Sequence, residues 1–94
     1  MNKTTRAHYD RLAALGCVAC LIDGYADTPA EIHHIRAGTG MGQRSKQCLP
    51  LCPPHHRGTN HPLTPSIHLS KINFTLRYGS EAELLDRVNT LLGE

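Results

Sequence analysis

The chain has 94 residues, a formal net charge of +2 and no tryptophan, so it is expected to form one small domain with a marginal apolar core. A structural metal is the usual additional support for a domain of this size. No apolar run approaches the ~18 residues of a membrane span, and the segment from Met1 to Asp10 lacks a signal-peptide-like apolar stretch. We therefore expect a cytoplasmic protein whose four cysteines stay reduced and act as metal ligands before disulfides.

A helix is predicted over residues 4–15. Its apolar side chains recur every three residues: Tyr9, Leu12 and Leu15. Gly16 follows, at a position where glycine commonly ends a helix. Cys17 and Cys20 come directly afterwards, and the two residues between them are the spacing of a zinc knuckle.

Two strands are predicted in the middle of the chain. After a loop over residues 21–29, residues 30–36 form a β-compatible segment that contains His33 and His34. Successive side chains of a strand point to opposite faces, so these adjacent histidines are expected to have different roles. Residues 47–51 are predicted as a second strand, antiparallel to the first.

Three helices are predicted in the C-terminal half. Pro53 and Pro54 favour the first turn of a short helix that Gly58 ends. A second helix is predicted up to Tyr78. Its apolar residues recur at helical spacing: Leu69, Ile72 and Leu76. Ser80 begins a capping-box pattern that opens a third helix. The apolar stripe of that helix is Leu84, Leu85, Val88, Leu91 and Leu92.

The first candidate site combines two pairs of ligand residues, each with two intervening residues. The pairs are Cys17 with Cys20, and Cys52 with His55. Both pairs can reach one tetrahedral zinc ion if a β-hairpin is inserted between them. Cys48 could replace a ligand, although its position on the second strand favours the core. Buried core cysteines are the alternative interpretation, and a redox dithiol is disfavoured because no thioredoxin-like βαβ pattern surrounds the pair.

Positive charge is concentrated in the middle of the chain. The window from Ile32 to Ser80 contains no Asp or Glu, and it holds six of the seven histidines. Its cationic residues are Arg36, Arg44, Lys46, Arg57, Lys71 and Arg77. This asymmetry suggests a basic face suited to a phosphate backbone, with ordinary surface charge as the alternative.

The sequence EIHHI…PLCPPHHRG resembles an HNH, or ββα-metal, nuclease. From about residue 12 to 92, the chain resembles the phage recombination-enhancement (Ref) proteins, which are RecA-dependent HNH endonucleases. The resemblance implies an α+β fold over residues 1–94: a small zinc-stapled ββα-metal (HNH/His-Me finger) domain with an N-terminal helix and two C-terminal helices. It also implies a phage- or prophage-encoded protein in a bacterial host cell.

Carried over by position, the resemblance implies that His34 is the general base. His33 and His56 would be ligands of a catalytic divalent cation (Mg²⁺, Mn²⁺ or Zn²⁺), with His61 as a third ligand. The middle Asn of the HNH pattern falls on Gln47, whose amide carbonyl would orient the base. His68 lies within the resemblance without an assigned role.

The expected function is that of a metal-dependent DNA endonuclease with a structural Zn²⁺. The resemblance implies that it acts on DNA with the RecA filament as a partner. Arg36, Arg44 and Arg57 are the candidate phosphate contacts. The alternative is a non-catalytic zinc-containing DNA- or protein-binding module, which would not need His33 and His34 together. A hydrolase of another class is disfavoured because no nucleophile motif for acyl transfer is present.

Overall fold

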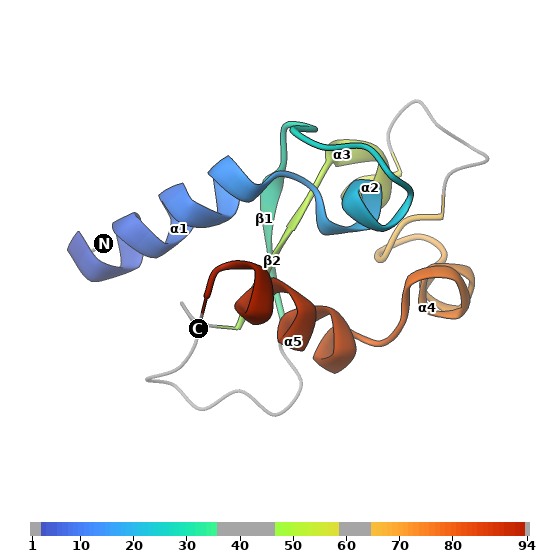
Figure 1. Cartoon of the computed structure of the whole chain (residues 1–94). Helices are drawn as coiled ribbons and strands as arrows, with labels where there is room; N and C mark the ends of the chain where they lie inside the picture. The colour runs from blue at the N-terminus through green and yellow to red at the C-terminus, as the bar shows by residue number, and fades with distance from the viewer. Residues whose placement is uncertain (1–2, 36–46, 59–64, 94) are drawn as a thin grey trace.

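The computed structural model describes residues 3–35, 47–58 and 65–93, and these form a small α+β arrangement (Figure 1). The elements in chain order are α1 (Lys3–Leu15), α2 (Val18–Ile22), β1 (Glu31–His34), β2 (Cys48–Leu51), α3 (Pro53–Arg57), α4 (Lys71–Tyr78) and α5 (Glu81–Leu91). Among these helices, none is long and apolar enough to cross a membrane.

The two strands pair antiparallel, as predicted, and the register fixes the direction of each histidine. His33 lies opposite Leu49, and His34 lies opposite Cys48. Directly opposed residues of an antiparallel pair share a face, and neighbours along a strand alternate between faces. His33 therefore points to one face with Leu49 and is buried, whereas His34 points to the other face and is exposed.

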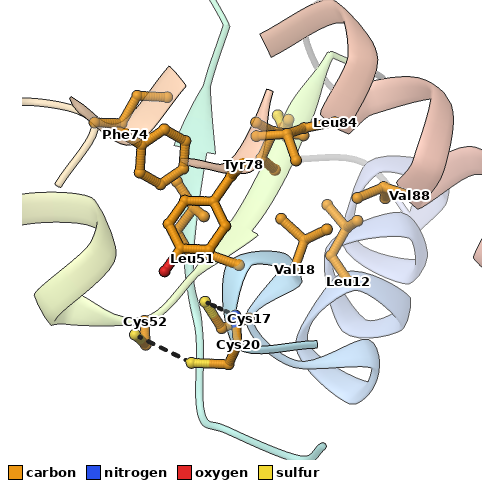
Figure 2. Close-up of a cluster of buried hydrophobic side chains, with 14 of the residues drawn as sticks. Leu12, Cys17, Val18, Cys20, Leu51, Cys52, Phe74, Tyr78, Leu84 and Val88 are labelled. Carbon is orange, nitrogen blue, oxygen red and sulfur yellow. Dashed lines mark hydrogen bonds between the residues drawn. The ribbon is translucent and has the colours of Figure 1, made fainter. Parts of the chain in front are cut away.

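The core forms around β2, which is buried along its whole length. Helices α1, α2 and α5 all pack against this strand. The labelled side chains of Figure 2 show leucine, valine and aromatic residues from these helices and from α4 gathered in one core cluster beside β2. This is why a strand with the apolar sequence Cys-Leu-Pro-Leu lies in the interior, where side chains on both of its faces are covered.

Local sequence explains where the short helices begin and end. Cys17 is the N-cap of α2, and its sulfur accepts a hydrogen bond from the Cys20 backbone amide. Helix α2 reaches Ile22, so the loop predicted from residue 21 begins later than expected. Helix α3 has proline in its first turn and ends at Gly58, whose φ of +77° lies in the left-handed region that favours glycine.

Helix α4 forms where it was predicted, but it buries a different side from the one that the apolar spacing indicates. Leu69, Ile72 and Leu76 are 75%, 78% and 80% exposed. The residues of α4 that pack into the core are Phe74 and Tyr78. Helix α5 has the predicted capping box, and its stripe is buried at Leu84 and Val88.

Candidate metal centres and active site

The four predicted ligands Cys17, Cys20, Cys52 and His55 converge on one buried point, here called the cysteine site. Their ligand atoms all lie within 4.8 Å of one another. The Cys20 and Cys52 sulfurs are 3.8 Å apart, and His55 Nδ1 lies 3.2 Å from Cys52 Sγ and 3.6 Å from each of the other two sulfurs. A tetrahedral zinc with bonds of about 2.3 Å to sulfur and about 2.0 Å to nitrogen requires S–S edges of about 3.8 Å and S–N edges of about 3.5 Å. The cysteine site could therefore hold a metal such as zinc.

The cysteine site is assembled from the starts of two short helices. Cys17 and Cys52 occupy the N-cap positions of α2 and α3, and the second ligand of each pair lies one turn further along its helix. Figure 2 shows the three cysteines beside one another. Burial raises the pKa of the Cys17 thiol to about 12. A thiolate at this position would need a nearby cation, whereas the reactive thiols of redox motifs have lowered pKa values.

His55 is held in the orientation that a ligand needs. Its Nε2–H donates to the Tyr78 hydroxyl at 2.9 Å, which leaves Nδ1 directed at the sulfurs. The Tyr78 hydroxyl donates in turn to Asp23 Oδ2 at 2.7 Å, and it accepts from Arg77 Nε at 3.0 Å. Such a chain fixes the tautomer of a ligating histidine.

A second group of ring nitrogens lies outside the cysteine site, and we call it the histidine cluster: His33, His56 and His68. The ring centroids of His33 lie 5.2 Å from those of both partners, and those of His56 and His68 are 4.7 Å apart. The three ligand atoms lie within 4.8 Å of one another. The donors thus come from β1, from α3 and from the turn that precedes α4.

Two carboxylates hold the rings of the histidine cluster. His33 Nε2 donates to Glu81 Oε2 at 2.8 Å, and His56 Nδ1 donates to Glu31 Oε1 at 2.7 Å. The remaining nitrogens, Nδ1 of His33 and Nε2 of His56, then carry the lone pairs that a metal needs. Burial lowers the pKa of His33 although Glu81 acts in the opposite direction, so the ring is neutral at pH 7. Both features fit a divalent cation, because imidazole nitrogens are common ligands of transition metals.

His34 is separate from the histidine cluster. Its Nε2 lies 3.2 Å from the Tyr9 hydroxyl of α1, on the face opposite to that of His33. Cys48 lies beside it on the same face and is fully buried, as its predicted core position requires. Gln47 Oε1 is buried and has no hydrogen-bond partner among the described residues, so its role in orienting the base stays a prediction.

The sequence also matches a family model over residues 3–93, and that family is described as recombination enhancement, RecA-dependent nuclease. The chain belongs to this family. The predicted resemblance to the recombination-enhancement proteins is thereby confirmed. Membership makes the protein a nuclease of RecA-dependent recombination, which suggests DNA as its substrate and RecA as a partner.

Of the cations predicted to contact phosphate in this nuclease, Arg57 is the one that the structure describes. It donates from Nε to Glu31 Oε1 at 2.7 Å and from its terminal nitrogen to Glu31 Oε2 at 3.0 Å. Its side chain is nevertheless 55% exposed. Arg36, Arg44 and the predicted third metal ligand His61 lie outside the described residues.

Two residues beside the histidine cluster, Glu31 and Glu81, were not assigned a role from the sequence, and His68 was noted there without one. Glu31 lies two residues before His33, so its carboxylate could have been recognised from the sequence as a neighbour of the histidines. His68 reaches the cluster because its segment pairs with α3, through hydrogen bonds from the Ile67 and His68 amides to the carbonyls of His55 and His56. Glu81 is 48 residues from His33 along the chain, and a contact over that separation cannot be predicted from local sequence spacing.

Gly58 permits this close approach of the His68 segment to α3. A Cβ at Gly58 would lie 2.7 Å from Leu69 Cδ1 and 3.1 Å from Ser66 Oγ. The nearer of these atoms is the end of an exposed leucine side chain that can move, so the main cost of a larger residue is the strain of a backbone with positive φ.

Proposed function

We propose that the protein is a metal-dependent DNA endonuclease of the HNH type, in which β1, β2 and α3 form the ββα unit of a single domain. In this proposal the histidine cluster binds the catalytic divalent cation, the cysteine site binds a structural Zn²⁺, and His34 is the general base. The setting is a bacterial cell in which the gene is carried by a phage or prophage.

The observation that carries this proposal is the histidine cluster itself. Three imidazoles converge, one of them buried and neutral, and two are hydrogen-bonded to carboxylates that hold their orientation. A binding module supported by the cysteine site alone would have no use for this second arrangement. In a chain that belongs to a nuclease family, the simplest role for it is catalysis.

The directions of His33 and His34 support a division of labour. A bound divalent cation would supply positive charge to the scissile phosphate and to the leaving oxygen. Displacement at phosphorus is in line, so the attacking and leaving oxygens lie on opposite sides. Adjacent β1 side chains point to opposite faces, so a phosphodiester crossing the end of β1 would meet the histidine cluster on one side and His34 on the other. There His34 would remove the proton of the attacking water.

Phosphate binding would draw on the basic window. Arg57 holds Glu31 through two hydrogen bonds and still exposes more than half of its side chain, so it can contact a phosphate without leaving the site. Arg36 and Arg44 are proposed to act in the same way. Contacts of this kind set the position of the DNA and carry no sequence preference.

The test is a metal titration of DNA nicking, with RecA filaments present, using Mg²⁺, Mn²⁺ and Zn²⁺ in turn. His33→Ala and His56→Ala should lose cleavage because the cation is bound more weakly, and raising the metal concentration should partly restore it. His34→Ala should keep DNA binding and zinc content but lose ~10²–10⁴ in rate at every metal concentration. His8→Gln, a histidine outside both sites, is the matched control and should cut like wild type.

Two outcomes would contradict the proposal. Cleavage by His34→Ala at the wild-type rate would show that His34 is not the general base. A wild-type protein that binds DNA but never cuts it, with any of these metals and with RecA filaments, would favour the binding module.

A further inference from the structure

We infer that Tyr9 is a positioning residue for His34: its hydroxyl accepts a hydrogen bond from Nε2–H and so keeps Nδ1 as the unprotonated nitrogen that faces water. The inference rests on the proposed role of His34 as general base. It assigns to α1 a part in catalysis that is distinct from packing.

The contact is specific in its geometry. The Tyr9 hydroxyl lies 3.2 Å from His34 Nε2, although the two residues are 25 positions apart. Their rings meet edge to face, with centroids 6.1 Å apart and planes at 88°. Tyr9 is itself packed against the hydrophobic core, so its hydroxyl is presented from a fixed position.

The direction of the hydrogen bond follows from what surrounds the hydroxyl. Cys48 lies opposite His34 in the strand pair, is fully buried, and contributes with burial to raising the pKa of Tyr9. Burial raises the pKa of Tyr9, so the hydroxyl keeps its single proton. If that proton is donated to the Cys48 sulfur, the oxygen is left to accept from His34, and one continuous chain runs from Nε2–H through the hydroxyl to sulfur.

The tautomer matters because a general base needs a lone pair directed at water. With Nε2 occupied by Tyr9, only Nδ1 of His34 remains for that task. In the opposite tautomer the proton is on Nδ1, and the lone pair on Nε2 faces the Tyr9 hydroxyl instead of a water molecule. A fixed ring orientation adds to this effect, since a misplaced catalytic group can lose about 100-fold in rate.

The experiment compares Tyr9→Phe with Tyr25→Phe, a control at a tyrosine that is 66% exposed. The first readout is the ¹⁵N NMR spectrum of the His34 ring, recorded at alkaline pH in the zinc-loaded protein without DNA. Wild type and Tyr25→Phe should show the Nε2–H tautomer, whereas Tyr9→Phe should show a mixture of both. The second readout is cleavage, in which Tyr9→Phe should lower kcat by about 10- to 100-fold with KM unchanged.

Removing the base should abolish the effect of Tyr9. In a His34→Ala background, Tyr9→Phe should cause no further loss, because residues that act through one another are not additive. An Nδ1–H tautomer in wild type, or an unchanged His34 spectrum in Tyr9→Phe, would overturn the inference. If wild type does not cut DNA, the proposed function fails, and the NMR readout alone still decides whether Tyr9 fixes the ring.

Discussion

Glu31 and Glu81 show how single residues far apart in the chain determine the chemistry of the histidine cluster. Burial alone would raise the pKa of Glu81, but its hydrogen bonds with His33 and Lys71 outweigh burial and lower it. The carboxylate is therefore charged at neutral pH and holds the Nε2 proton of His33. The identity of the nitrogen that can bind a metal thus depends on a residue of α5.

Replacing Glu81 with Gln should weaken the metal affinity of the histidine cluster by about 10- to 100-fold, because a ligating histidine loses the carboxylate that orients it. Asp86→Asn, an exposed carboxylate change on the same helix, is the control. Calorimetric titration of Mn²⁺ into protein whose cysteine site is already loaded with zinc measures the difference. Equal affinities in the two variants would show that Glu81 does not support the cluster.

Acid should destabilise the fold through the same pair. Folding lowers the pKa of His33 from its ordinary 6.5, so its neutral form is favoured, and this contribution is present above pH 6.5 and lost as pH falls toward the folded value. Glu81 acts in the same direction at lower pH, below its ordinary 4.5. Urea unfolding at pH 7 and pH 5.5 should show a smaller loss of stability for His33→Asn, which cannot gain a proton, than for wild type. Identical losses would exclude His33 as a source of acid sensitivity.

At the scale of elements, the sequence predicted the strands and helices of the described residues except α2, but the apolar spacing of Leu69, Ile72 and Leu76 does not mark the buried side of α4. The helical period shows that a segment is helical, and it shows which apolar residues share a face. It does not show whether that face packs against the core, because this depends on which side of α4 the neighbouring elements contact. Phe74 and Tyr78 are buried because the core and His55 lie on their side of the helix.

This distinction gives a paired prediction for α4. Phe74→Ala should reduce the free energy of unfolding by about 3–5 kcal/mol, since it removes a fully buried aromatic ring from the core. Ile72→Ala, two residues earlier on the exposed side, should change it by no more than about 0.5 kcal/mol. Denaturant unfolding of both variants is the measurement. A comparable loss in Ile72→Ala would mean that the exposed face of α4 is covered in solution.

For the whole molecule, the cysteine site could be predicted from sequence, whereas the histidine cluster could be predicted only in part. Each half of the cysteine site is a local pair whose spacing matches one helical turn. The four ligands Cys17, Cys20, Cys52 and His55 could therefore be predicted from the sequence. The histidine cluster depends on the path of the chain after α3. His33 and His56 were identified through the motif, whereas the position of His68 depends on the hydrogen bonds between its segment and α3.

Metal removal should therefore unfold much of the domain. Cys52→Ser should release zinc and lose its cooperative thermal transition, because the free energy of metal binding is part of the free energy of folding. Cys48→Ser, at a buried cysteine outside the cysteine site, should keep its zinc and its transition. Zinc content and circular dichroism of the two variants provide the comparison. A native-like cooperative melt of zinc-free wild type would contradict this expectation.

A metal shared by the ligands of α2 and α3 would also affect the unfolded chain. Cys20 and Cys52 are 32 residues apart, and the loop that a shared metal closes contains β1 with both of its histidines. By the loop-closure relation used for cross-links, closing such a loop reduces the conformational entropy of the unfolded chain and raises its free energy by about 4 kcal/mol. The two strands are themselves joined by a long connection, so their pairing is an entropically costly step. A chain that already binds zinc has completed most of that closure, and refolding from denaturant should accordingly be faster with zinc than without it.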